Sequence, residues 1–289
     1  MPDDHSHDDR HDRGLAFDLA TLRARQSIPR VDRRHALKIL VGAGAGVVLV
    51  ACSSDSGDTA ESTSSSTSTT GATSSTTAAS GEPVEAVPQE TGGPFPGDGS
   101  NGPNVLVESG VVRQDIRSSF GDHSGTAEGI PLNLALQIVD QATGAPRQGA
   151  ALYAWHCTRE GGYSLYSSGV TDQNFLRGVQ VADADGNLSF TTIYPGAYEG
   201  RWPHIHFEVF PDVDTATSAG NPSVTSQIAL PEGASREAYL TEGYEQSLSN
   251  LNRSSIDSDM VFSDGYESQL ATVNGDPTSG YTAILVIGI

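Results

Sequence analysis

The stretch Thr191–Phe210, TTIYPGAYEGRWPHIHFEVF, contains the residues on which the interpretation of this chain depends. Its last seven residues, His204–Phe210, alternate between apolar and polar with a period of two, which predicts a strand. The odd-numbered apolar residues fall on one face of this strand, and His204 and His206 fall on the other. Because side chains on one strand face point the same way, the two imidazoles can converge on one metal ion.

Three nearby residues favour a metal site over the alternative of two half-exposed surface histidines. Tyr198 lies six residues before His204, Arg201 lies three before it, and Tyr163 belongs to an earlier segment. An H-x-H pair alone favours the surface interpretation, because many strands carry one by chance. Each companion also has a structural alternative: Tyr163 as a core tyrosine, and Arg201 as the partner of Glu199 on a solvated loop.

Composition excludes several classes of function. The chain has 289 residues and a formal net charge of −20. From Glu82 onward, 26 acidic residues stand against 8 arginines, a net charge of −18, so no nucleic acid is expected as a partner. The only lysine, Lys38, lies near the N-terminus, which excludes Schiff-base chemistry and Walker-type nucleotide sites. Cys157 is expected to be a free, buried thiol, because the only other cysteine, Cys52, lies in a very different context.

The first 52 residues are predicted to be an export signal. Arg33-Arg34 precede the apolar run Ile39–Ala51, which resembles a twin-arginine signal and is shorter than the roughly 20 residues that a spanning helix needs. The run ends at Leu49–Cys52, which resembles a bacterial lipobox and implies a lipid on Cys52. The alternative is an uncleaved apolar anchor with an incidental cysteine. We therefore expect an exported bacterial protein, cell-surface or extracellular, whose membrane attachment is only through the lipid at Cys52.

The rest of the chain is predicted to be a linker followed by one domain. Residues 53–88 begin with a tract of Ser, Thr, Ala and Gly that cannot form a core and predicts a disordered linker. Residues 89–289 contain short apolar runs between turn residues, which predict an all-β fold, an antiparallel β-sandwich with long irregular loops. The predicted strands are 132–140, 150–155, 188–193, 204–210, 224–230 and 281–289.

Two further segments have weaker patterns. Residues 235–250 have a weakly helical pattern. The acidic segment Asp183–Asn187 predicts a hairpin turn rather than a calcium loop, because the later bidentate glutamate is missing.

The order of motifs resembles that of the intradiol ring-cleavage dioxygenases, the family of protocatechuate 3,4-dioxygenase and catechol 1,2-dioxygenase. Trp155 is followed eight residues later by Tyr163, then by the turn DADG, then by IYPGAY and finally by RWPHIHF. The arm at 91–95 and the segment 140–150 are similar to the same family, so the resemblance covers roughly residues 89–230. It implies a non-haem Fe(III) cofactor.

The resemblance also implies roles for individual residues. The iron ligands would be Tyr163, Tyr198, His204 and His206. Tyr198 would be the axial ligand that the substrate displaces, Arg201 would lie over the substrate ring and stabilise charge there, and Gln227 would support the site from behind the ligands.

Two other histidines and one tyrosine compete for these roles. Tyr194 lies four residues before Tyr198, but Pro195-Gly196 lead into Tyr198 as they do in the family. His123 and His156 lack the spacing of metal ligands and are interpreted as non-ligands.

The implied chemistry agrees with the donor types. Two phenolates are hard anionic donors that favour Fe(III) over Fe(II), and Fe(III) is a Lewis acid that lowers the pKa of catechol hydroxyls. The resemblance implies that a small aromatic diol and O2 are the substrates, with the ring cleaved between the hydroxylated carbons to a muconate-type diacid. It allows for a homodimer, because the family includes homodimers and larger assemblies.

Two other functions remain open at this stage. A non-catalytic transthyretin-like β-sandwich would be a cell-surface binding module, and residues 134–193 suit it. Such a module has no need of two tyrosines and an H-x-H pair. A cupin-type Fe(II) oxygenase would need a carboxylate ligand near that pair, and only Glu208 is available.

Overall fold

The computed structural model of this chain describes residues 81–218 and 220–289. Arg33-Arg34, the apolar run, Cys52 and residues 53–80 of the proposed linker lie outside the described residues, so export and lipidation stay predictions. Within the described part, none of the helices has the length and apolar character needed to cross a membrane.

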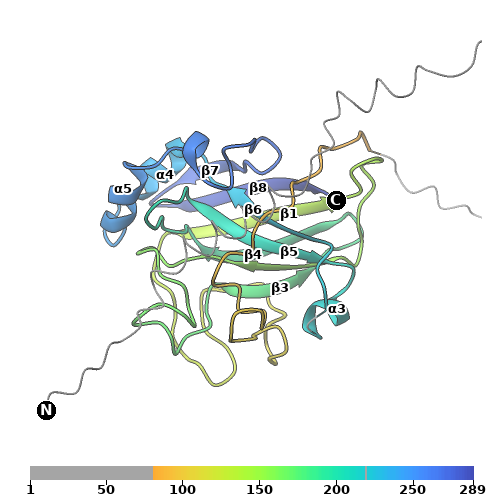
Figure 1. Ribbon diagram of the computed structural model, residues 1–289, viewed down its shortest axis with the longest axis horizontal. Helices are drawn as coiled ribbons and strands as arrows, with labels where there is room; N and C mark the ends of the chain where they lie inside the picture. Colours follow the sequence, from red (N-terminus) through yellow and green to blue (C-terminus); the bar gives the residue numbers. More distant parts are fainter. Residues whose placement is uncertain (1–80, 219) are drawn as a thin grey trace, which may run out of the picture. The chain divides into compact units, whose positions relative to one another are not determined.

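The described strands form two four-stranded sheets packed face to face (Figure 1). The first sheet has the order β4-β1-β8-β7, with β1 (Pro131–Val139), β4 (Asn187–Ile193), β7 (Thr272–Asp276) and β8 (Gly280–Gly288). The second has the order β3-β2-β5-β6, with β2 (Ala151–Trp155), β3 (Arg177–Val181), β5 (His204–Phe210) and β6 (Val224–Ala229).

The hydrophobic core lies between these two sheets. Along β1 every second residue from Leu132 to Ile138 is buried in it, as expected for a strand with one covered face. Strand β5 differs, because all seven of its residues are buried. Its odd-numbered residues enter the core, and its other face, with His204 and His206, is covered by loops. Both histidines are only 2% exposed, so the interpretation as surface histidines is wrong.

The strand predictions are largely confirmed. The six predicted strands match β1, β2, β4, β5, β6 and β8 to within one residue at each end. Sequence reasoning misses β3, whose sequence RGVQV mixes a charge and a glycine with the apolar residues. It also misses β7, because TVNGD contains Asn-Gly, a turn signal, and the strand is mostly exposed.

Two topological expectations need correction. Strands β1 and β8 run parallel, so the sandwich is antiparallel in every strand pair but this one. The segment Asp183–Asn187 joins β3 to β4, which belong to different sheets, so it is not a hairpin. The Asp183 carboxylate accepts hydrogen bonds from the amides of Asp185 and Asn187, which closes the turn locally.

Short helices complete the described chain. The weak helical pattern at 235–250 corresponds to two helices, α4 (Glu232–Ala238) and α5 (Glu245–Leu251), and Gly243 between them has a φ of 92°. Helix α3 (Val213–Thr217) follows β5, and a 3₁₀ turn, η2 (Ile256–Ser258), follows α5. Figure 1 shows α4 and α5 together at one end of the sheets.

Contacts with the sheets begin before the predicted domain start at Gln89. Val84 donates its amide to the Gln141 carbonyl, and Val87 donates to the Gly288 carbonyl at the end of β8. Val87 is also buried in the core. The segment 84–88 therefore packs as part of the domain, although it was predicted to belong to the linker.

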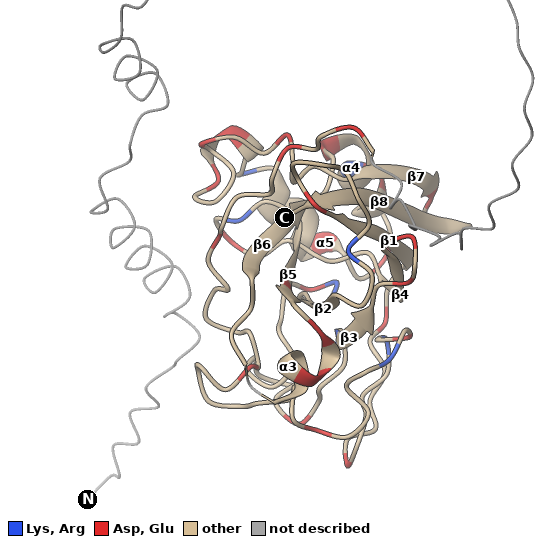
Figure 2. Ribbon diagram, turned by 90° about the vertical axis from the view of Figure 1, so that its right-hand side faces the viewer, with Lys and Arg blue, Asp and Glu red and all other residues tan. Residues whose placement is uncertain are grey.

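Acidic residues (red in the ribbon of Figure 2) outnumber arginines (blue) over the described residues. Two of the arginines in this region, Arg177 and Arg201, are buried on the second sheet and its adjoining loop. Burying a guanidinium is costly unless its N–H groups are satisfied. Each of these two buried guanidinium groups therefore needs hydrogen-bond acceptors within the fold.

Candidate metal centre

Four side chains converge on the outer face of the second sheet. The Nε2 atoms of His204 and His206 lie 3.1 Å apart. The hydroxyl oxygens of Tyr163 and Tyr198 each lie 3.4 Å from His204 Nε2. The structure thus brings together the four residues that the sequence pointed to. Among residues 81–218 and 220–289, no group of three or more His, Cys, Asp or Glu is placed to hold a metal, and the two histidines here have tyrosine hydroxyls beside them.

Both imidazoles are held in the neutral form that binds metals. His204 Nδ1 donates to the Trp202 carbonyl at 2.5 Å, which leaves the Nε2 lone pair directed at the cluster. Burial lowers the pKa of His204 to about 3, and the nearby Arg201 charge adds to this effect. Burial and the neighbouring His204 also lower the pKa of His206 well below its usual value. The His206 ring stacks on Trp155, with centroids 4.9 Å apart and planes 6° apart.

Tyr163 is held by a tight loop after β2. Its amide donates to the Ser167 hydroxyl at 2.8 Å, and the Ser167 amide donates back to the Tyr163 carbonyl at 2.8 Å. The side chain is 2% exposed. Burial raises the pKa of Tyr163 well above its usual value, and the adjacent Tyr198 raises it further. Ionising the Tyr163 phenol therefore requires a compensating positive charge in the cluster.

Tyr198 lies on the loop between β4 and β5, which helix α5 holds in place. A Cβ on Gly196 would lie within about 2.6 Å of two backbone carbonyl oxygens and the Ser247 hydroxyl, so only glycine fits. The amide of Ala197 donates to the Ser247 hydroxyl at 3.0 Å, and Asn250 donates to the Ala197 carbonyl at 2.8 Å. Tyr198 is half-buried, whereas Tyr163, His204 and His206 are buried. The cluster is therefore most accessible on the Tyr198 side.

The competing ligand Tyr194 points elsewhere. It lies in the core between the sheets, with its hydroxyl 2.8 Å from the Ser235 hydroxyl. The preference for Tyr198 over Tyr194 therefore agrees with the geometry.

Arg201 is fixed by a buried carboxylate that sequence reasoning missed. Its Nε donates to Asp259 Oδ2 at 2.9 Å, and its Nη1 donates to the Tyr198 hydroxyl at 3.1 Å. Asp259 also accepts from the Trp202 amide at 2.7 Å. Burial opposes ionisation of Asp259, but the Arg201 charge outweighs it and holds the pKa of Asp259 below its usual value. The suggested solvated pair of Arg201 with Glu199 is wrong, because Arg201 is 1% exposed and pairs with Asp259.

Gln227 connects Arg201 to the Gly- and Pro-rich segment at residues 89–105, called the arm below. Its Oε1 accepts from Arg201 Nη2 at 2.6 Å, and its Nε2 donates to the Thr91 carbonyl at 2.9 Å. Gln227 therefore supports the site through its contact with Arg201. No local pattern could have identified Asp259, which lies 58 residues after Arg201 and follows the 3₁₀ turn η2.

The remaining candidate residues have other partners. His156 Nδ1 donates to the Cys157 carbonyl at 2.8 Å, and its Nε2 accepts from the Thr192 hydroxyl at 2.7 Å. Glu208 shares the strand face of the two histidines but accepts a hydrogen bond from the Thr225 hydroxyl at 3.2 Å. Burial raises the pKa of Glu208 to about 7. Cys157 is a free, buried thiol, as predicted.

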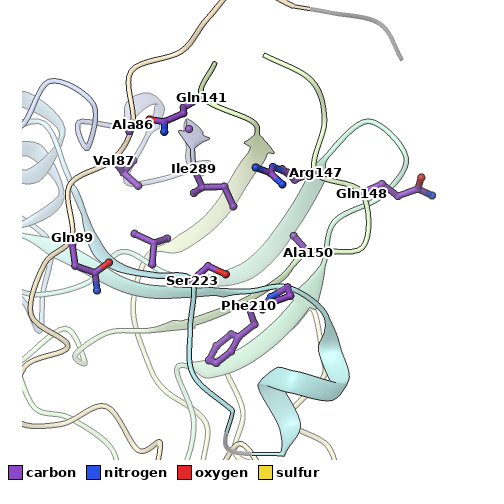
Figure 3. Close-up of a pocket in the computed structure, with 13 residues that line it drawn as sticks. Ala86, Val87, Gln89, Gln141, Arg147, Gln148, Ala150, Phe210, Ser223 and Ile289 are labelled. Atoms are coloured by element: carbon purple, nitrogen blue, oxygen red, sulfur yellow. The ribbon is translucent and has the colours of Figure 1, made fainter. Parts of the chain in front are cut away.

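The described part of the chain also has a cavity of about 580 Å³ (Figure 3). Its lining includes Gln89, Arg147, Phe210 and Ile289. None of the four clustered donors lines it, so this cavity does not define the candidate centre.

Comparisons with known proteins agree with the arrangement of these residues. Residues 102–213 match the model of a family described as Dioxygenase. A segment of 61 residues is 41% identical to chlorocatechol 1,2-dioxygenase from Rhodococcus opacus, covering 21% of this chain and about a quarter, 24%, of that relative's length.

Solved structures extend the likeness over the described domain. An intradiol ring-cleavage dioxygenase from Tetranychus urticae superposes with a TM-score of 0.55 at 26% identity, covering 71% of this chain and 94% of that one. A further dioxygenase structure gives 0.56 at 27% identity with the same two coverages. In its matched residues and in its fold, this chain is similar to intradiol ring-cleavage dioxygenases.

Proposed function

We propose that this protein is an iron-dependent intradiol dioxygenase that cleaves the ring of catechol-type substrates with O2. The observation that carries the proposal is the convergence of His206 Nε2 and two phenol oxygens within 3.4 Å of His204 Nε2. A binding module of the transthyretin-like kind would not need to bury two neutral histidines against two tyrosines, because such burial of polar groups costs free energy.

The donor set fits Fe(III). The His204 Nε2 lone pair points into the cluster, and burial raises the pKa of the Tyr163 phenol, so its ionisation requires a cation beside it. Phenolates are hard donors that suit a trivalent ion. When bound, Fe(III) would supply Lewis acidity toward the catechol hydroxyls and O2. The four side chains Tyr163, Tyr198, His204 and His206 would hold it.

The chain's own residues have separate roles in this proposal. Tyr198, on the accessible side, would be one of the residues that hold the ion, and its phenolate oxygen would be placed to accept a proton from a catechol hydroxyl. Arg201 donates to the Tyr198 oxygen at 3.1 Å, so its fixed charge can stabilise negative charge on that oxygen or on the ring beside it. Asp259 and Gln227 hold the Arg201 plane in that orientation.

The test measures iron content, visible colour and oxygen uptake on purified variants. His204→Ala and His206→Ala should lack iron and colour, whereas His123→Ala, a histidine whose ring bonds to the Asp172 carbonyl, should retain both. Tyr198→Phe should retain some iron, with a shifted visible band and severely reduced turnover.

Arg201→Ala should keep iron and colour and lose roughly 100-fold in turnover, the scale seen when a fixed charge-stabilising donor is removed. Catechol should yield a muconate-type diacid without added reductant, because both oxygen atoms enter the product. Full activity and iron content in His206→Ala, or a strict need for NADH, would refute the proposal.

A further inference from the structure

Arg177 is a fully buried arginine, and within the described part of the chain its guanidinium donates only to uncharged oxygen atoms. Its Nε donates to the Ser164 hydroxyl at 3.0 Å, and its two terminal nitrogens donate to four further oxygen atoms. These acceptors are the carbonyls of Phe95, Pro96 and Ser164 and the hydroxyl of Tyr153. A guanidinium has five N–H donors, so each donor of Arg177 has one neutral acceptor. Such complete satisfaction fixes the group in one position.

The acceptors belong to three segments that meet over the metal centre. Phe95 and Pro96 lie on the arm, Ser164 directly follows the ligand Tyr163, and Tyr153 is on β2. The Tyr153 hydroxyl also donates to the Pro96 carbonyl at 2.7 Å. Arg177 itself is on β3, at the edge of the second sheet. The guanidinium therefore joins the arm to the Tyr163 loop and to the sheet.

The same arm is held at its other end by β6. The Glu90 amide donates to the Thr225 carbonyl at 2.7 Å, and Gln227 donates to the Thr91 carbonyl at 2.9 Å. Between the two ends, Gly92 passes over Trp155, whose ring stacks on His206. The arm (orange in Figure 1) thus crosses the sheet from the β6 edge to the β3 edge, over the strand that carries the two histidines.

Backbone geometry shows that the arm and Arg177 fit closely. Gly97 has a φ of 69°, and a Cβ at this position would lie 2.8 Å from Arg177 Nη1. That nitrogen cannot easily move aside, because its two hydrogen bonds hold it. Two non-glycine residues in the described chain have positive φ. Leu165 directly follows Ser164, and Leu176 directly precedes Arg177. Such strained residues persist only where the surrounding structure fixes them.

We propose that Arg177 is a positioning residue that anchors the arm. The anchored arm packs the Phe95 ring against Tyr163, with ring centroids 5.2 Å apart, and this ring forms one wall of the substrate pocket. The effect on substrate rests on the proposed function, whereas the anchoring does not. Release of Arg177 leaves the iron ligands in place but lets the arm move, so substrate binding suffers more than the chemical step.

The first test measures amide hydrogen exchange in the metal-free protein, where activity plays no part. Arg177→Lys keeps the charge but has at most three donors in place of five. The amides of Gly97, Gly99 and Val105, which bond within the arm and to Tyr166, should exchange roughly tenfold faster in this variant. Unchanged exchange at these three amides in a folded Arg177→Lys protein would overturn the inference.

A matched glycine pair keeps the proposal testable if Arg177→Lys does not fold. Gly97→Ala places a methyl group against the guanidinium, whereas Gly121→Ala has a similar φ of 63° and nothing within 4 Å. Both variants bear the backbone cost of positive φ, so only Gly97→Ala should release the arm and speed exchange there. Equal exchange of the arm in these two variants would also overturn the inference.

Kinetics of the iron-loaded protein then separate the two proposals. Gly97→Ala should keep wild-type iron content and colour, with a KM for catechol raised about tenfold and kcat reduced far less. A lower kcat with an unchanged KM would show that Arg177 does not shape the pocket. A wild-type protein that takes up no oxygen would refute the proposed function and leave the exchange result standing.

Discussion

Acid should destabilise this domain through His156, a buried histidine outside the metal centre. Its ring is 1% exposed and joins the second sheet to β4 through the Thr192 hydroxyl. Burial lowers the pKa of His156 from 6.5 to about 4, because the charged ring would be desolvated. The unfolded chain therefore binds a proton at a higher pH than the folded chain does. The stability from this group is fully present above pH 6.5 and is lost as the pH falls toward 4.

The size of this effect follows from the two pKa values. A difference of about 2.5 pKa units corresponds to about 3 kcal/mol in total, of which about 2 kcal/mol is lost between pH 7 and pH 5. For a domain of this length, about 2 kcal/mol corresponds to a fall of roughly 4–8 °C in Tm.

The assay compares urea unfolding of wild type and His156→Gln at pH 7 and pH 5. The glutamine keeps a polar side chain in the site but cannot take up a proton. The wild type should lose about 2 kcal/mol more than the variant between the two pH values. Contributions from His204 and His206 are present in both proteins and cancel in the difference. Equal losses in the two proteins would refute the assignment of this acid sensitivity to His156.

Three further predictions concern other parts of the chain. Asp259→Ala should lower the free energy of unfolding by about 3–5 kcal/mol, because Arg201 is left buried without its carboxylate. The control Asp115→Ala, at an exposed ion pair, should lower it by under about 1 kcal/mol, and equal losses in urea unfolding would contradict this prediction. Cys157 should resist iodoacetamide in the folded protein and react on unfolding, because burial raises the pKa of its thiol to about 12; rapid native labelling by mass spectrometry would count against it. Cys52→Ala should release the protein from the membrane fraction or block processing, and unchanged attachment with an unchanged mature mass would argue against a lipobox.

The sequence was sufficient to predict the strand that carries the two histidines. Alternation along His204–Phe210 predicts both the strand and its two faces, and the structure confirms both. The positions of Tyr163 and Tyr198 came from family resemblance, since no periodicity relates loops that are 35 residues apart. The structure brings both hydroxyls to His204.

Residues that act through long-range contacts could not be predicted. Asp259 follows a short 3₁₀ turn, and only folding brings it to Arg201. Arg177 looks like a solvated charge at the start of a poorly patterned segment. Its burial becomes favourable only when carbonyls of the distant arm reach its guanidinium. These side chains depend on tertiary contacts, on which local propensity carries no information.

The parallel pairing of β1 with β8 has a consequence for the order in which the domain can fold. Strand β8 lies inside the first sheet, between β1 and β7, although its residues come last in the described chain. During synthesis, β1 can pair with β4 early, but its second neighbour does not exist until residues 280–288 have left the ribosome. All strands of the second sheet, by contrast, lie between residues 151 and 229. A nascent chain can therefore assemble the histidine-bearing sheet while the opposite half of the core stays open, a stage at which exposed apolar surface invites aggregation.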